Sequence, residues 1–333
     1  MVTRRRVVIA LGAGALAPLA SFAQQQPANV ARIGYLIIGS LHSPETRVIL
    51  EALRQGLRER GYVEGKNIII EYRAADGKME RVPGLATELV GLNVDLIVAG
   101  STLLARAVQQ ATTTIPIVAP ALGDPVGDGF VASLARPGGN ITGATFLGPG
   151  LVPKHLALLK EAVPRAARVA ALWHPGAFGE RTTREMFTET EAAARTLGVQ
   201  LQRVGVRSPD ELDRAFSTMT SEGADALVTL PSPLLYSERT RLVGLAAKHR
   251  LPSMFNAREF VELGGLISYG ASIPELNRRA ATYIDKILKG AKPGDLPIEQ
   301  PTRFELVINL KTAKALGIKI PNSILVQATK VIE

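Results

Sequence analysis

The sequence predicts an α/β protein in which two doubly wound parallel-sheet lobes are joined by a multi-strand hinge. From residue 31 onward, short apolar runs rich in β-branched residues alternate with helical patterns, an order typical of parallel sheets covered by helices on both faces. The second half of the chain repeats this order. With 333 residues, and roughly 150 residues per domain as a guide, the chain is long enough for two such units.

Each element of the first half follows from its own residues. The helix predicted over 44–60 has apolar residues at helical spacing and ends at Gly61. Ser101 and Thr102 suit the N-cap of a further helix. The predicted strands are 33–38, 67–72, 95–99, 116–121 and 141–146, and the other predicted helices are about 80–92, one opened by residues 100–102, and a short one over 128–134.

The second half contains an equivalent for each of these strands. The equivalents are 168–173, 200–206, 224–230, 252–256 and 265–269. Residues 139–145 and 264–270 are similar exits from the two halves, each followed by a helix led by proline, over 153–163 and 274–289. If each exit crosses to the other lobe, the helix from 274 packs on the first lobe and residues 304–310 return to the second.

The crossings define the predicted domain organisation. Lobe one comprises residues 31–146 plus about 271–297, and lobe two comprises residues 147–270 plus about 298–333. Because a few crossing residues can absorb bending, such a hinge permits the lobes to close around a ligand.

The N-terminus predicts a secretory signal peptide over residues 1–23. Arg4, Arg5 and Arg6 precede an apolar stretch over 7–19, and the small-x-small pattern Ser21-Phe22-Ala23 predicts cleavage after Ala23. The arginines also resemble a twin-arginine export signal, with Sec export as the alternative. Losing these three arginines lowers the formal charge of +9 to +6, which is spread along the chain and predicts no nucleic-acid binding.

The composition excludes several kinds of site. The chain has no cysteine and only four scattered histidines, so it predicts no disulfide, no thiolate nucleophile, no metal site and no cofactor. Nucleophile-elbow, phosphate-loop and kinase motifs are missing, and the paired acids lie on solvated helix faces. We therefore expect that the protein is not an enzyme.

Candidate ligand-binding residues follow from the rule that open parallel sheets bind ligands outside the carboxyl ends of their strands. The set is rich in hydroxyls and amides, which suits a small zwitterion or polar organic solute. Ser101 and Thr102 are candidates to hold a carboxylate at a helix N-terminus, and Asp124 is a candidate to pair with an amine. The candidates are Ser40, His42, Ser101, Thr102, Asp124, Pro125 and Thr145 in lobe one, and His174, Ser232, Asn256 and Tyr269 in lobe two.

Structural roles are the alternative for several candidates. In this alternative, Ser101 or Thr102 caps a helix without contacting a ligand, and Asp124 forms a turn before Pro125. His174 is then a packed loop residue. His155 and His249 fall in amphipathic helices and are expected on the surface.

Four segments resemble one known family. They are GYVEGKNI (61–68), ATTTIPIV (111–118), GDPVG followed by LARPGGNITG (123–143), and QPTRFELVINLKTAKALG (300–317). They are similar to the substrate-binding proteins of ABC transporters related to the tryptophan- and tyrosine-binding type, and the resemblance covers essentially the whole mature chain.

The resemblance implies a periplasmic-binding-protein fold of type I, in which a solute is captured between the lobes and delivered to ABC permease subunits. It also implies a freely diffusing periplasmic protein, because the lipid-anchoring cysteine of many relatives is missing, and we expect a monomer. With 5% aromatic residues and few at the candidate positions, the sequence predicts no aromatic stacking pocket.

Three other functions stay open at this point. A solute sensor or accessory binding protein would have the same two lobes. A cytoplasmic regulator would need a DNA-binding module, for which residues 1–30 offer no room. A Rossmann-type enzyme would need a glycine-rich first βα turn, which Gly39-Ser40-Leu41-His42 does not provide.

Overall fold

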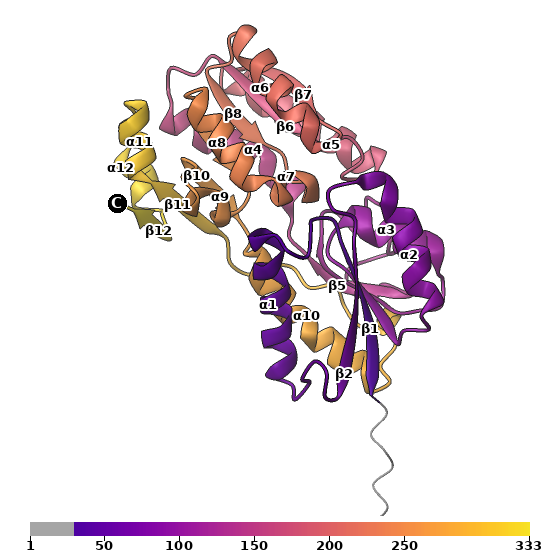
Figure 1. The fold of residues 1–333 in the computed structure, drawn as a ribbon. Coiled ribbons are helices and arrows are strands. Elements are labelled where there is room, and N and C mark those ends of the chain that lie inside the picture. The colour runs from indigo at the N-terminus through magenta and orange to yellow at the C-terminus, as the bar shows by residue number, and fades with distance from the viewer. Residues whose placement is uncertain (1–29) are drawn as a thin grey trace, which may run out of the picture.

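Two separate β-sheets form the framework of the chain in the computed structural model (Figure 1). The structure describes residues 30–333, so the predicted signal peptide over 1–23 lies outside the described residues. One sheet has five strands and the other has seven, and helices cover both. Two α/β lobes are therefore present, and this prediction is confirmed.

Lobe one contains the five-stranded sheet, whose order is β2-β1-β3-β4-β5 with all pairs parallel. This is a doubly wound order, so the ends of β1 and β3 lie at the point where the winding reverses. Its elements are β1 (Ala31–Ile37), α1 (Pro44–Arg58), β2 (Ile68–Ala74), η1 (Met79–Arg81), α2 (Val82–Gly91), β3 (Leu96–Ala99), α3 (Thr102–Ala111), β4 (Ile117–Leu122) and β5 (Ile141–Thr145).

Lobe two repeats that order in the run β7-β6-β8-β9-β10, which is the structural counterpart of the sequence repeat. Its first elements are α4 (Gly148–Ala162), β6 (Arg168–Trp173), α5 (Glu180–Thr196), β7 (Gln200–Gly205), η2 (Pro209–Glu211), α6 (Leu212–Ser221) and β8 (Ala226–Thr229). They are followed by α7 (Pro233–Ser237), α8 (Arg239–Lys248), β9 (Ser253–Phe255), α9 (Arg258–Glu262) and β10 (Ile267–Gly270).

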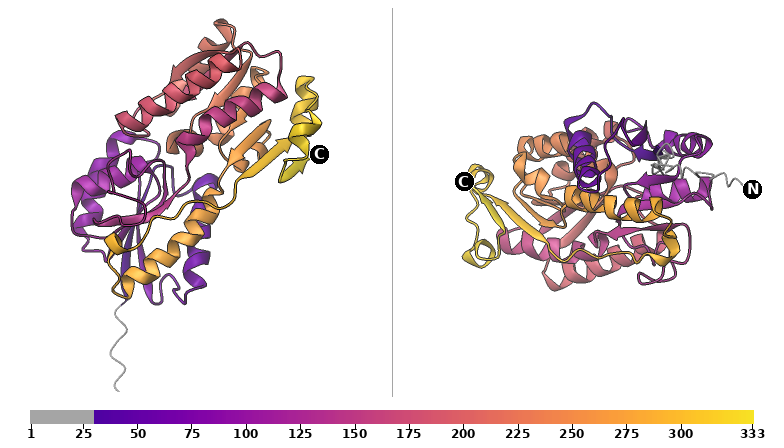
Figure 2. Two further views of the ribbon diagram at one scale, coloured as in Figure 1. Left: turned by 180° about the vertical axis from the view of Figure 1, so that it is seen from behind. Right: turned by 90° about the horizontal axis from the view of Figure 1, so that it is seen from below.

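The chain crosses between the lobes three times, as the exits predict. It crosses at residues 146–147 after β5, at 271–272 after β10, and at 300–304 on its return to lobe two (Figure 2). The last elements are α10 (Ile273–Leu288), η3 (Pro293–Asp295), β11 (Glu305–Asn309), α11 (Leu310–Leu316), α12 (Asn322–Leu325) and β12 (Lys330–Ile332). Since the chain returns from the opposite lobe, β11 pairs antiparallel with β10, a detail that the pattern did not predict.

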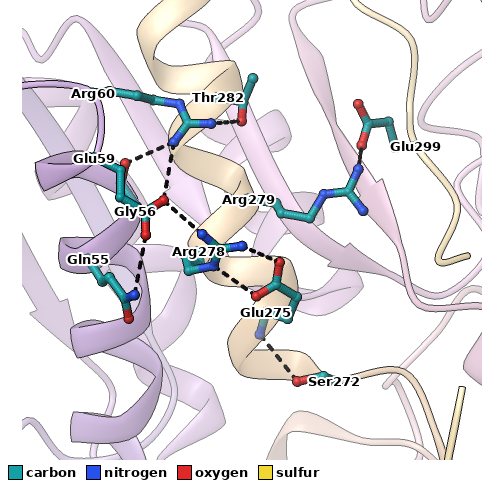
Figure 3. A network of polar contacts seen from close by, with 10 residues as sticks. All are labelled: Gln55, Gly56, Glu59, Arg60, Ser272, Glu275, Arg278, Arg279, Thr282 and Glu299. Atoms are coloured by element: carbon teal, nitrogen blue, oxygen red, sulfur yellow. Dashed lines mark hydrogen bonds and ion pairs between the residues drawn. The ribbon is translucent and has the colours of Figure 1, made fainter. Parts of the chain in front are cut away.

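Helix α10 belongs to the packing of lobe one. It lies against α1 and β4, where Ala280, Ala281 and Ile284 join the core formed by β1 and α1. Ion pairs border this contact, with Arg278 bridging Glu59, the C-cap residue of α1, and Glu275 of its own helix at 2.8 Å each (Figure 3). The prediction that this helix packs back on the first lobe is thus confirmed.

Two expected helices differ from the structure. Residues 128–134 form a turn at 128–129 and then irregular structure instead of the predicted short helix, because Gly129 adopts a positive φ of 76° and the preceding loop closes on the Asp124 carboxylate. The helix expected from Pro153 begins five residues earlier, at Gly148, with Pro149 in its first turn and Pro153 inside it. The predicted start was wrong because proline favours the first turn of a helix, and both Pro149 and Pro153 fit that position by sequence.

Candidate functional site

A cavity of about 120 Å³ lies between the two lobes, at the carboxyl ends of strands from both sheets. One enclosed water needs only about 10–15 Å³ on the same measure, so the space suits a small organic molecule. Most of the lining is apolar. From lobe one and the crossings, the lining side chains include Tyr35, Ile37, Ile38, Glu45, Thr46, Ile49, Ser101, Thr102, Phe146, Ile273 and Asn277; from lobe two they include Ala177, Phe178, Ser232, Tyr236, Ser237, Arg239 and Asn256.

Four of the residues predicted from sequence line this cavity, namely Ser101, Thr102, Ser232 and Asn256. Ser101 is the N-cap of α3, where its Oγ accepts a hydrogen bond from Leu104 N at 3.3 Å. Thr102 Oγ1 accepts one from Gly123 N at 3.0 Å. Because each of these oxygens acts as an acceptor, its hydroxyl proton is available to a ligand. The cap and the ligand-facing roles are therefore compatible.

Asp124 and Pro125 do not line the cavity. Asp124 Oδ1 accepts a hydrogen bond from Gly127 N at 2.8 Å, and its Oδ2 accepts one from the Thr182 hydroxyl at 3.5 Å. The carboxylate is thus turned into its own loop and toward α5, and Pro125 is buried in the same loop.

Thr145 and Tyr269 lie at the crossings. Thr145 is fully buried; its hydroxyl donates to the Leu122 carbonyl at 2.8 Å and accepts from Leu147 N at 3.1 Å, next to the first crossing. The Tyr269 ring stacks on Phe304 with centroids 5.7 Å apart, which joins the end of β10 to the third crossing. Both residues are placed where they shape the hinge.

The remaining three candidates also lie outside the cavity. His42 is exposed, and its backbone N–H donates to Ser40 Oγ at 3.4 Å, so these two residues form a local turn. His174 is buried after β6; burial, and then the charge of Arg207, lower its pKa to about 4.

Sequence reasoning missed the aromatic side chains of the cavity. Tyr35, Phe146, Phe178 and Tyr236 all line it, and the rings of Phe146 and Phe178 lie 6.5 Å apart. The expectation that the cleft contains no aromatic pocket is therefore wrong. Phe146 and Phe178 follow strand ends, so the rule that selected the polar candidates would also have found them.

A buried polar pair was also missed at the lobe-one wall. The Tyr35 hydroxyl donates to Asn277 Oδ1 at 2.8 Å, and Asn277 Nδ2 donates to the Ile273 carbonyl at 3.0 Å. Burial raises the pKa of Tyr35 above its usual range, so it stays protonated. Asn277 stands alone among the apolar residues that α10 turns toward lobe one, and a lone amide on an apolar face was the available signal.

Hydrogen bonds join the lobes beside the cavity, and that from Thr182 to Asp124 is one of them. Gly179 N, at the start of α5, donates to Asp128 Oδ1 at 2.6 Å, and the Thr240 hydroxyl donates to Glu45 Oε1 at 2.6 Å. The Asp128 carboxylate is fully buried, and burial raises its pKa against the opposing effect of the Gly179 bond. These contacts exist only while the lobes are together.

His155 corrects an expectation about the surface. It was predicted to be exposed, but α4 packs on the lobe-two sheet and leaves His155 with no exposed area. Its Nε2–H donates to the Tyr269 carbonyl at 2.6 Å, and its Nδ1 has no partner among the described residues. Burial lowers the pKa of His155 to about 4, although the bond to Tyr269 opposes this shift. His249 is half-buried, with Nδ1 3.4 Å from the Thr220 hydroxyl.

His155 should make the stability of the protein depend on pH. The unfolded chain takes up a proton near pH 6.5, whereas the folded chain does so near pH 4. Its contribution is therefore complete above pH 6.5 and falls by roughly 3 kcal/mol as the pH is lowered to 4. Urea titrations between pH 4 and 7 should show a shallower pH dependence for His155→Gln than for the wild type. His42→Gln, at an exposed position, is the control, and equal slopes for all three proteins would contradict the assignment.

Neither a membrane span nor a metal cluster is found in the part of the chain that the structure describes. No helix within residues 30–333 has the length and apolar character needed to cross a bilayer. In the same range, no three His, Asp or Glu side chains are grouped to hold a metal ion.

Comparison with known proteins gives one consistent family. A model of the family described as ABC transporter substrate binding protein matches residues 37–332. A tyrosine-binding protein of Clostridioides difficile (strain R20291) is 28% identical over 266 residues, which cover 80% of this chain and 75% of that protein.

Solved structures agree with this result. An ABC domain from Streptococcus pneumoniae in complex with L-Trp is 30% identical with a TM-score of 0.81, and the match covers 91% of this chain and 99% of the other. The ligand-free, open structure of a substrate binding protein with adhesive properties from Clostridium difficile is 25% identical over the same shares, with a TM-score of 0.60. Two lobes with the same doubly wound order give the type I periplasmic-binding-protein fold that the motifs implied. The chain belongs to the family of ABC transporter substrate binding proteins.

Proposed function

We propose that this chain is the periplasmic solute-binding component of an ABC-type import system, which captures an aromatic amino acid between its lobes and delivers it to a permease. The observation that carries the proposal is the cavity bounded by both lobes, because a molecule held there contacts both lobes only when they are together. Its apolar lining with Tyr35, Phe146, Phe178 and Tyr236 favours an aromatic side chain. The relatives named for tyrosine and solved with L-Trp support the same solute class.

The conformation described here fits the closed form. The interlobe hydrogen bonds of Asp128 and Glu45 are made. The chain also matches the L-Trp complex with a TM-score of 0.81 but the open, ligand-free relative with only 0.60, although the covered shares are the same. An open orientation of the lobes lowers such a score without changing the coverage, which supports the closed form for this chain.

Capture then follows from a shift of population. The three crossings let the lobes separate, and the empty protein favours the open form. A solute that touches both walls binds the closed form more tightly, and only this difference in affinity can move the equilibrium. The permease distinguishes the loaded protein by its closed shape.

A thermal-shift screen tests the solute class. L-Tryptophan, L-tyrosine or L-phenylalanine at about 100 times its dissociation constant should add about 2.7 kcal/mol to the stability of the folded state, which corresponds to a rise of several degrees in Tm. L-Glutamate and L-lysine are the controls, because a second charge does not fit the apolar lining. If none of the aromatic amino acids raises Tm or gives binding heat in calorimetry, the proposed solute class is wrong.

The same solute allows delivery to be tested. Uptake of the labelled amino acid should fall when the gene for this protein is deleted, and it should be restored by a copy that contains residues 1–23 but not by one that lacks them. Unchanged uptake after deletion would contradict the import function while leaving solute binding intact.

A further inference from the structure

Arg239 is a buried positive charge at the wall of the cavity. Only 4% of this residue is exposed, and it lines the cavity from the start of α8 in lobe two. Its Nη1 donates to the Tyr236 carbonyl at 2.9 Å, and its guanidinium lies over the Tyr236 ring, 4.5 Å from the centroid. Two contacts from one neighbour hold the guanidinium in place.

Arg239 has no ion-pair partner within residues 30–333. The buried acid Glu259 pairs with Arg258 at 3.7 Å, and the charge of Arg239 also acts on it, since it opposes the rise that burial causes in the pKa of Glu259. Nε and Nη2 of Arg239 make no hydrogen bond to any described group. Burying a charge is costly unless it is paired, and an arginine fork matches a carboxylate with two parallel hydrogen bonds. The free side of the Arg239 fork therefore offers hydrogen bonds to an anion that enters the cavity.

Glu45 is the acid on the opposite wall. It belongs to the first turn of α1 in lobe one, and the Thr240 hydroxyl binds its Oε1 at 2.6 Å. Partial burial favours its neutral form, but the hydrogen bonds from Thr240 and from its own backbone, together with the charge of Arg239, outweigh burial and lower the pKa. Glu45 is thus ionised at neutral pH, and it lines the cavity.

We propose that Arg239 and Glu45 hold the two charged groups of a zwitterionic α-amino acid, with the ligand carboxylate on Arg239 and the ligand ammonium on Glu45. This inference rests on the proposed function and specifies which residues recognise the solute. Arg239 and Glu45 both line the cavity, and the charge of Arg239 helps to lower the pKa of Glu45, but the two side chains form no ion pair among the described residues. One charge comes from each lobe, and the ligand side chain is left to the aromatic part of the cavity.

Arg239 and Glu45 differ from the residues that the sequence suggested as partners of a ligand's charged groups. Asp124 was the candidate partner for an amine, but its carboxylate is occupied within its own loop. Glu45 and Arg239 were not candidates because they belong to the first turns of helices rather than to the residues directly after a strand. Their charges meet the cavity only because α1 and α8 face each other when the lobes are closed, as the bond from Thr240 to Glu45 records.

Ligand analogues test the inference on the wild-type protein. Each aromatic amino acid is compared in calorimetry with the arylpropanoate that lacks its amino group and with the arylethylamine that lacks its carboxylate. Each loss should weaken binding about tenfold or more, because it leaves one protein charge buried without a partner. If the amine binds as tightly as the amino acid, Arg239 does not hold a carboxylate.

Variants assign each charge to its residue. Arg239→Gln should weaken amino-acid binding about 30-fold or more and should leave arylethylamine binding unchanged. Glu45→Gln should weaken the amino acid about tenfold and spare the arylpropanoate. Arg241→Gln on α8 and Glu51→Gln on α1 are the matched controls, because both residues pair with surface partners outside the cavity. Arg239→Lys, which keeps the charge but loses the fork, serves if Arg239→Gln does not fold.

The outcomes separate this inference from the proposed function. If the wild type binds an aromatic amino acid and Arg239→Gln or Arg239→Lys binds it within about threefold of the wild type, the assignment of Arg239 is overturned and the proposed function stands. If the wild type binds none of the aromatic amino acids, the proposed function fails, and this inference fails with it.

Discussion

Replacing Gly56 with alanine should destabilise the protein by roughly 3 kcal/mol, although alanine is the better helix former. Gly56 is buried in α1 where this helix meets α10. A Cβ atom built there lies 2.0 Å from the Arg278 carbonyl oxygen and 3.0 Å from Ala281 Cβ. A backbone oxygen of α10 cannot rotate away as a side chain does, so the two helices must separate.

The separation would also break the polar contacts that border this helix pair (Figure 3). Arg60 Nη1 donates to the Gly56 carbonyl at 3.0 Å, and Arg278 binds Glu59 at 2.8 Å. Because α10 follows the second crossing, weaker packing of α10 on α1 would also make the hinge more flexible.

Urea unfolding of Gly56→Ala, with hydrogen exchange of α10, measures the effect. Gly84→Ala is the matched control in the same lobe, since Gly84 lies in α2 with nothing within 4 Å of an added Cβ. That control should gain up to about 1 kcal/mol from helix propensity. If Gly56→Ala gains stability in the same way, the close approach of α1 and α10 is wrong.

The parts of the fold that local pattern determines were predictable. The positions of most strands follow from short apolar runs and from the repeat, and the returning helix follows from two similar exits. Ser101, Thr102 and Ser232 could be placed at the cavity because capping hydroxyls lie at the strand tips of any doubly wound sheet.

The rest depends on contacts between distant segments. Arg239 and Asn277 reach the cavity because α8 faces α1 and because α10 packs on lobe one, and neither fact is encoded in the spacing of neighbouring residues. The prediction that His155 is exposed was wrong for a related reason: α4 packs on the sheet of lobe two, and His155 bonds to Tyr269 of β10. Asp124 lies outside the cavity lining because its carboxylate accepts a hydrogen bond from the backbone N–H of Gly127 in its own loop.

Replacing Gly179 with alanine should weaken solute binding about tenfold or more while leaving the Tm of the empty protein unchanged. The N–H of Gly179 is the donor to Asp128 across the cleft, and a Cβ there would lie 2.7 Å from Asp128 Oδ1. Asp128 is held by its burial and by Arg106, whose Nη2 donates to its carbonyl at 3.2 Å. Gly179 has a φ of −64°, which alanine adopts without strain, so the clash arises only between lobes.

A double-mutant cycle isolates that contact, because Asp128→Ala removes both the bond and the obstacle. Adding Gly179→Ala to Asp128→Ala should therefore cost little further affinity, whereas Gly150→Ala, with open space around it in the first turn of α4, should bind like the wild type. Calorimetry gives the affinities, and small-angle scattering with and without solute reports how far each variant closes. If the losses of affinity caused by Gly179→Ala and Asp128→Ala are fully additive, these two residues do not contact each other in the closed form. The ligand and the Gly179–Asp128 bond both stabilise the closed form. Weakening this bond should therefore lower the affinity for every solute by the same factor, whereas Arg239→Gln should change the relative affinities for different solutes.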